Sequence, residues 1–134
     1  MSQPISIVKS PNKKVVEAYM VGLSNLDRPA LLSCLTDDVE RVEWADGIDG
    51  SGVAQIGKAA VIQNIDRPAD VAMRSEITRM TEENNIVVAE SMVRLSKKES
   101  GVFLTLRVCS IYELENGKIR KVNSFMAEEK KRSA

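Results

Sequence analysis

Residues 102–126, VFLTLRVCSIYELENGKIRKVNSFM, contain the clearest indication of the fold. Asn116-Gly117 divides this stretch, and both residue types accept the positive φ angles of a tight two-residue hairpin turn. On either side of the turn apolar and polar side chains alternate, which is the period of a half-buried strand. The stretch therefore predicts two long antiparallel strands, at 102–115 and 118–126.

The residues before this hairpin predict two further strands, at 71–81 and 86–96, joined by a turn at Asn84-Asn85. A fifth, shorter strand is expected at 39–44, after a polar turn at 36–38. The glycine-rich segment 47–52 reads as a loop, and it lacks the lysine of a phosphate-binding loop. Because the long strands follow one another with short turns, we expect a meander.

The N-terminal part of the chain predicts helices. Ser10 and Pro11 form a typical helix start, and apolar residues recur behind them at helical spacing, so a helix is expected at 11–24. A second helix begins near Asp27, with Leu31, Leu32 and Leu35 as its apolar face. A third is expected at 57–65, ended by Arg67-Pro68. Helices first and strands after predict an α+β fold, with the helices on one face of an antiparallel sheet.

Composition limits the possible functions. The 134 residues make one domain, 1–134, with a core at about 12–127 and a charged tail at 128–134. Lys and Arg number 19, Asp and Glu 19, and no apolar run could span a membrane, so neither nucleic acid nor membrane is an expected partner. Because two cysteines show no metal-ligand spacing and no secretory signal is visible, we expect a cytoplasmic protein.

The chain contains no histidine. This excludes Ser-His-Asp and Cys-His nucleophilic sites and His-ligated metals, and no cofactor or metal is expected. Any chemistry must use carboxylates, Tyr, Lys, Arg or Cys.

In element order the chain resembles the nuclear transport factor 2-like superfamily, most closely its SnoaL-like and ketosteroid-isomerase-like members. The resemblance rests on Tyr19, the 31–35 helix, the segments 36–39 and 42–44, Ser51-Gly52 and the segment 115–119, and it covers about residues 12–127. It implies a cone-shaped curved antiparallel sheet packed against the N-terminal helices, in a cystatin-like arrangement. It also implies a pocket for a hydrophobic small molecule at the open end, and a homodimer formed through the outer sheet face.

The isomerase branch moves a proton beside a ketone, with a carboxylate base and with a tyrosine and a protonated aspartate as donors to the enolate oxygen. The resemblance places Tyr19 on the tyrosine, Glu43 on the base and Cys109 on the aspartate. Scytalone-dehydratase-like members depend on histidine, which this chain lacks. Limonene-epoxide-hydrolase-like members use an Arg-x-Asp pair, of which Arg107-Val108-Cys109 keeps only the arginine.

The residues by themselves leave alternatives open. Glu43 lies either on a solvated strand edge or in an apolar pocket, and Tyr19 packs in the core or lines that pocket. Burial of apolar surface favours turning Leu104, Leu106 and Val108 toward the helices, whereas the resemblance points Cys109 inward. Either one β-bulge reconciles the two, or Arg107 and Cys109 face outward into a dimer interface. The pocket is expected to be completed by a set of binding residues: Trp44, Met92, Arg107, Cys109, Ser124 and Met126.

The favoured function is a small-molecule-binding SnoaL-like domain, an isomerase or cyclase that moves a proton beside a carbonyl of a cyclic substrate. Glu43 is then the base and Tyr19 the hydrogen-bond donor to the oxyanion. The alternative is a non-catalytic ligand-binding or dimerisation module, so the sequence leaves enzymatic activity undecided.

Overall fold

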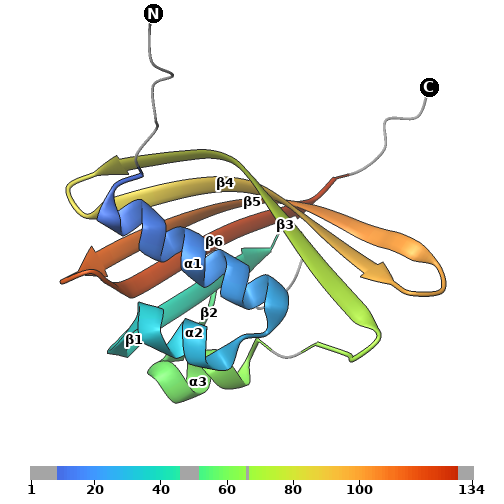
Figure 1. Cartoon of the computed structure of the whole chain (residues 1–134), viewed down its shortest axis with the longest axis horizontal. Helices are drawn as coiled ribbons and strands as arrows, with labels where there is room; N and C mark the ends of the chain where they lie inside the picture. The colour runs from blue at the N-terminus through green and yellow to red at the C-terminus, as the bar shows by residue number, and fades with distance from the viewer. Residues whose placement is uncertain (1–8, 46–51, 66, 130–134) are drawn as a thin grey trace, which may run out of the picture.

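The computed structural model describes residues 9–45, 52–65 and 67–129. Within these ranges the elements are, in chain order, α1 (Pro11–Asn25), α2 (Arg28–Cys34), β1 (Leu35–Ala45), β2 (Val53–Ile56), α3 (Lys58–Gln63), β3 (Val71–Glu83), β4 (Ile86–Lys97), β5 (Gly101–Glu115) and β6 (Lys118–Glu128). The strands form one sheet in the order β2-β1-β6-β5-β4-β3. Figure 1 shows this sheet curving, with α1, α2 and α3 together on one side of it. The predicted α+β fold is confirmed.

Local sequence signals explain the start of α1 and the hairpins. The Ser10 hydroxyl accepts a hydrogen bond from the Lys13 amide at 3.1 Å, which caps α1 close to where the sequence predicted it. Asn116 and Gly117 have φ angles of 51° and 77°, as the predicted β5–β6 turn requires. The β3–β4 turn also has two asparagines at positive φ, so residues that tolerate positive φ specify the first and the last of the three turns in the meander.

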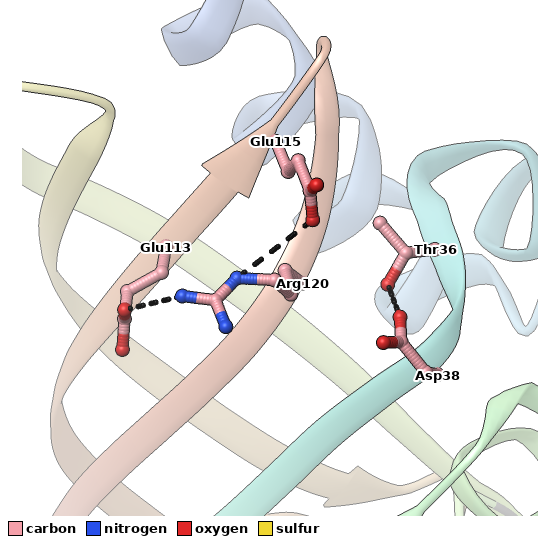
Figure 2. Close-up of polar contacts among 5 residues, drawn as sticks. All are labelled: Thr36, Asp38, Glu113, Glu115 and Arg120. Carbon is pink, nitrogen blue, oxygen red and sulfur yellow. Dashed lines mark hydrogen bonds and ion pairs between the residues drawn. The ribbon is translucent and has the colours of Figure 1, made fainter.

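The segment before β1 differs from the prediction. The 36–38 segment belongs to β1 rather than to a turn, and Leu35, expected on the second helix, is a fully buried strand residue. Between Leu35 and Glu40 the pairing with β6 shifts register, so the strand is irregular there. The Thr36 hydroxyl donates to an Asp38 carboxylate oxygen at 2.9 Å across this irregularity (Figure 2). A local hydrogen bond of this kind is also typical of turns, which explains the error.

Two more boundaries need correction. The edge strand β2 was not predicted, because its four residues carry too short a pattern to be recognised. The helix α3 is shorter than the predicted 57–65. Most of the predicted glycine loop, 47–51, and the end of the charged tail, 130–134, lie outside the described residues.

Charged side chains flank the β5–β6 hairpin. Arg120 on β6 forms an ion pair with Glu113 at 3.0 Å and approaches Glu115 to 4.0 Å, both on β5 (Figure 2). These groups are substantially exposed, so the pairs fix the register of the hairpin more than they add to stability.

The hydrophobic core lies between the helices and the face of the sheet that they cover, called here the inner face; the opposite face is the outer face. Its largest fully buried side chains are Val16, Tyr19, Leu31, Leu35, Val39, Val61, Val87, Ile119 and Val122. In the part of the chain that the structure describes, no helix is both long and apolar enough to cross a membrane.

Candidate functional site

A cavity of about 250 Å³, called here the inner-face cavity, lies between α1 and the sheet. Tyr19, Met20 and Leu23 of α1 close one side of it, and Ile65 and Arg67 contribute from the connection between α3 and β3. Apolar side chains make up most of the sheet wall: Met73, Val93, Leu95, Leu106, Val108, Val122 and Met126. An apolar cavity with a few polar groups is the usual form of a small-molecule site.

The strand β5 decides which residues reach this cavity. Leu106, Val108 and Ser110 line it, so Arg107 and Cys109 between them project from the outer face. The irregularities in the pairing of β5 fall near its two ends, outside this segment. No bulge reverses the alternation here, and burial of the leucine face against the helices settles the orientation.

On β1, Arg41 and Glu43 both line the inner-face cavity and form an ion pair with each other. The Arg41 side chain is 13% exposed and that of Glu43 is 36% exposed. The guanidinium uses Nη2 for this pair, whereas its buried Nη1 has no hydrogen-bond partner among the described residues. The charged face of this strand therefore borders the cavity rather than forming a fully solvated edge.

Tyr19 is 1% exposed, and its buried hydroxyl oxygen finds no hydrogen-bond partner in the described part of the chain. Its ring meets the ring of Tyr112 edge to face, with centroids 6.0 Å apart and planes at 76°. Burial raises the pKa of Tyr19, which the positive charge of Arg41 opposes and the negative charge of Glu43 reinforces. The phenol therefore keeps its proton and remains a hydrogen-bond donor.

Serines form a polar strip across the apolar floor of the cavity. The hydroxyls of Ser110 on β5 and Ser124 on β6 are 2.8 Å apart and buried. Ser124 is the register partner of Glu43 on β1, and Ser91 on β4 lines the same cavity. The strip therefore continues from the carboxylate across the neighbouring strands.

The structure brings some of the predicted site residues together and separates others. Tyr19, Glu43, Ser124 and Met126 all line the inner-face cavity. Met92, Arg107 and Cys109 instead border a depression of about 310 Å³ on the outer face, which Met126 also reaches.

Trp44 also projects away from the cavity. It is 40% exposed and stacks on Phe125, with ring centroids 6.2 Å apart and planes at 7°. The predicted binding set is thus divided between the two faces of the sheet.

Arg67 is a cavity residue whose role the sequence did not indicate. Its guanidinium donates to the carbonyl oxygens of Leu23 at 3.1 Å and Ser24 at 2.7 Å, at the end of α1, and to that of Val71 at 3.1 Å, at the start of β3. It therefore ties the helix to the sheet at the wall of the cavity. The partners lie far apart in sequence, so no local pattern could have revealed this contact.

Comparisons with known proteins agree with this geometry. A family model described as SnoaL-like domain matches residues 16–122. No curated protein is found to match the sequence.

Within the described ranges, no group of three or more His, Cys, Asp or Glu side chains could hold a metal ion.

Solved structures share the fold at low identity. An LEH-like epoxide hydrolase from M. tuberculosis superposes with a TM-score of 0.71 and 20% identity, over 87% of this chain and 82% of that one. An NTF2-like protein of unknown function from Burkholderia pseudomallei gives 0.72 and 23%, over 87% and 90%. TerC, co-crystallised with polyporic acid, gives 0.70 and 22%, over 86% and 90%.

Proposed function

The chain belongs to the SnoaL-like domain family, and we propose that it binds a small cyclic carbonyl compound in the inner-face cavity and moves a proton beside the carbonyl. Glu43 is the base in this proposal, and Tyr19 donates a hydrogen bond to the oxygen on which negative charge develops. The observation that carries it is that Tyr19 and Glu43 line the same apolar cavity, while the Tyr19 hydroxyl has no hydrogen-bond partner among the described residues.

The size of the cavity limits the ligand. Ligand pockets usually measure about 300 to 1,000 Å³. The inner-face cavity, at about 250 Å³, lies just below this range. We therefore expect a compound of one or two rings, with its apolar body against Leu106 and Val108 and its oxygen toward Tyr19.

The polar groups suit a carbonyl oxygen. A buried hydroxyl without a partner costs about 1 to 3 kcal/mol, so a ligand acceptor beside Tyr19 gains a strong preference over an apolar group. A carbonyl polarised in this way acidifies its neighbouring C–H bonds. Glu43 is only partly exposed and faces the same space, so its carboxylate can take the proton from that carbon.

A second candidate is activation of water for epoxide opening. Arg41 and Glu43 form an Arg-x-carboxylate pair that faces the cavity, and a structural neighbour is described as an LEH-like epoxide hydrolase. The pair lies on β1 rather than at the Arg107-Val108-Cys109 position considered from the sequence. Hydrolysis of styrene oxide that is lost in Glu43→Gln, without any proton exchange on ketones, would favour this candidate.

We further propose that the outer face of the sheet pairs with a second copy of the chain. Trp44 and Phe125 expose a stacked aromatic pair there, next to the depression bordered by Met92 and Cys109. Exposed apolar surface of this kind is typical of association surfaces.

The proton-transfer proposal is tested with 2-tetralone, a two-ring ketone with exchangeable hydrogens beside its carbonyl. In D2O, NMR should show the wild-type chain accelerating deuterium incorporation, and Glu43→Gln should lower that rate by about 10² to 10⁴, the usual contribution of a general base. Glu40→Gln is the matched control, because Glu40 lies on the same strand but does not line the cavity. Binding without Glu43-dependent exchange would instead support a non-catalytic ligand-binding module.

A further inference from the structure

We infer that Arg41 is a catalytic residue, the second hydrogen-bond donor to the enolate oxygen. It holds that oxygen together with Tyr19 through Nη1, which has no hydrogen-bond partner among the described residues. The inference rests on the proposed function, and it assigns an enolate, rather than a neutral carbonyl alone, as the species that this site binds best.

Two buried donors at the cavity have no acceptor among the described residues. Tyr19 Oη and Arg41 Nη1 are both buried, both belong to residues that line the inner-face cavity, and neither has a partner in the described ranges. A guanidinium has donors only, so Nη1 requires an acceptor. One oxygen with full negative charge can accept from both groups, and hydrogen bonds to such an oxygen are roughly twice as strong as neutral ones.

A third unpartnered atom lies on the neighbouring strand. Gln55 on β2 is the register partner of Arg41, and its buried Oε1 also lacks a hydrogen bond among the described residues. Gln55 does not line the cavity. Among the three residues with unpartnered atoms, only Tyr19 and Arg41 line the cavity, so they are the two that can donate to a ligand there.

Arg41 has one negatively charged partner at every stage of the proposed reaction. Before the step, Arg41 balances the carboxylate of Glu43. During the step, a C–H bond beside the carbonyl breaks and its proton forms an O–H bond with Glu43. The electron pair of the C–H bond forms a C=C bond, and a carbonyl electron pair moves to oxygen. Negative charge has passed from Glu43 to the enolate, and Arg41 faces one negative partner throughout.

The transfer of negative charge from Glu43 to the enolate has a lower barrier because the positive charge of Arg41 is already in place before the reaction. The Arg41 side chain is only 13% exposed and therefore poorly solvated, so little reorganisation is needed when the enolate forms. The attraction between Arg41 and the ligand oxygen strengthens as Glu43 is protonated and negative charge builds on that oxygen, so it favours the transition state over the bound ketone. Arg41 thus takes the place that the resemblance gave to Cys109, which lies on the outer face.

The test uses 2-naphthol, whose planar two-ring phenolate resembles the enolate of 2-tetralone. Affinity and ionisation are measured together by absorbance at one fixed pH, in Glu43→Gln and in Arg41→Met/Glu43→Gln. In this background no carboxylate remains to be neutralised, so the comparison isolates the donor role of Arg41. We expect the single variant to bind 2-naphtholate at least about tenfold more tightly than the double variant, the usual worth of a hydrogen bond to a charged group. Neutral 2-tetralone should bind the two variants about equally.

Equal binding of 2-naphtholate by the two variants, or no binding to either, would overturn the inference. Thermal melting checks that both variants fold, and Arg41→Gln/Glu43→Gln replaces the methionine variant if the latter does not. The proposed function has its own readout: Glu43-dependent exchange on 2-tetralone with equal 2-naphtholate affinities would leave that proposal standing and remove only the role of Arg41.

Discussion

The rings of Tyr19 and Tyr112 meet edge to face in the core, but their hydroxyl groups differ in hydrogen bonding. Tyr112 is 2% exposed, and a side-chain hydrogen bond with Ser110 acts on its hydroxyl, although burial still raises its pKa above the ordinary value. The Tyr19 hydroxyl has no such partner in the described ranges. A buried donor without an acceptor lowers stability, so its retention beside a cavity points to a ligand contact.

The raised pKa values predict alkaline unfolding. An unfolded tyrosine ionises near pH 10, whereas burial keeps Tyr19 and Tyr112 protonated above it. The native state therefore holds more protons, so this contribution to stability is complete below about pH 10 and is lost as pH rises toward the folded pKa values. Each tyrosine should lower the free energy of unfolding by roughly 1.4 kcal/mol per pH unit over that range.

Tyrosinate absorbance and circular dichroism, recorded together during a titration with base, check this prediction. Tyrosinate should form only as the helical and strand signal disappears, and Tyr112→Phe should make the alkaline transition shallower. Ionisation of either tyrosine while the native dichroism persists would show that the rings are accessible to solvent.

The family resemblance, rather than local pattern, singled out Tyr19 and Glu43 from the sequence. The apolar helix face of Tyr19 and the alternation of Glu43 with Arg41 left open whether either residue lines a pocket. Two features could not be predicted, because each depends on chain segments that are distant in sequence: the lack of a partner for Arg41 Nη1 in the described part of the chain, and the contact of Arg67 with the end of α1.

At the scale of elements, the cavity depends on how α1 is fixed to the sheet. The last carbonyl groups of a helix lack part of their intrahelical bonding, and a guanidinium suits them because it is cationic and offers several donors in a fixed plane. Arg67 satisfies two of these carbonyls and also the first residue of β3.

Loss of this contact should loosen the wall of the cavity. Arg67→Ala is expected to lower the free energy of unfolding by about 1 to 3 kcal/mol, because partly buried carbonyls lose bonds to a charged donor. Arg67→Lys should recover less than half of that loss, since an ammonium cannot span the three carbonyls. Urea denaturation measures both, with Arg74→Ala on the exposed face of β3 as control. Equal stability of the Arg67→Ala and Arg74→Ala variants would disprove the role of the contact.

The elements themselves differed in how well the sequence specified them. The α1 helix and the β3–β4 and β5–β6 hairpins have caps and turn residues in the chain itself, so their positions were predicted closely. The start of β1 depends on pairing with β6, and the edge strand β2 depends on pairing with β1. Pairing between distant segments leaves little local signal, which accounts for both errors.

At the scale of the whole molecule, the sheet separates two surfaces with different predicted partners, a ligand on the inner face and a second copy on the outer face. The order of helices and strands was enough to predict this architecture, since each element must bury one apolar face. The sequence did not predict which face of the central strands turns toward the helices, because apolar residues occur on both faces of β5. Leu106 and Val108 face inward, whereas Cys109 and Ile111 face outward.

The proposed dimer makes a prediction at this scale. A charge placed in the stacked aromatic pair should prevent association, so Phe125→Glu is expected to be monomeric where the wild type is a dimer. Val21→Glu is the control, because Val21 is also exposed but lies on the helical side. Sedimentation velocity distinguishes the species, and a monomeric wild type at all concentrations would contradict the proposed interface.

The most direct test of the central claim is the NMR spectrum of the chain labelled on its methionine methyl groups, titrated with 2-tetralone. Met20 and Met73 line the inner-face cavity, whereas Met92 borders the outer-face depression. The methyl signal of Met92 therefore serves as an internal reference. A ligand in the cavity should shift the methyl signals of Met20 and Met73 and leave that of Met92 in place. A shift confined to Met92, or no shift at saturating ligand, would contradict the assignment of the inner-face cavity as the binding site.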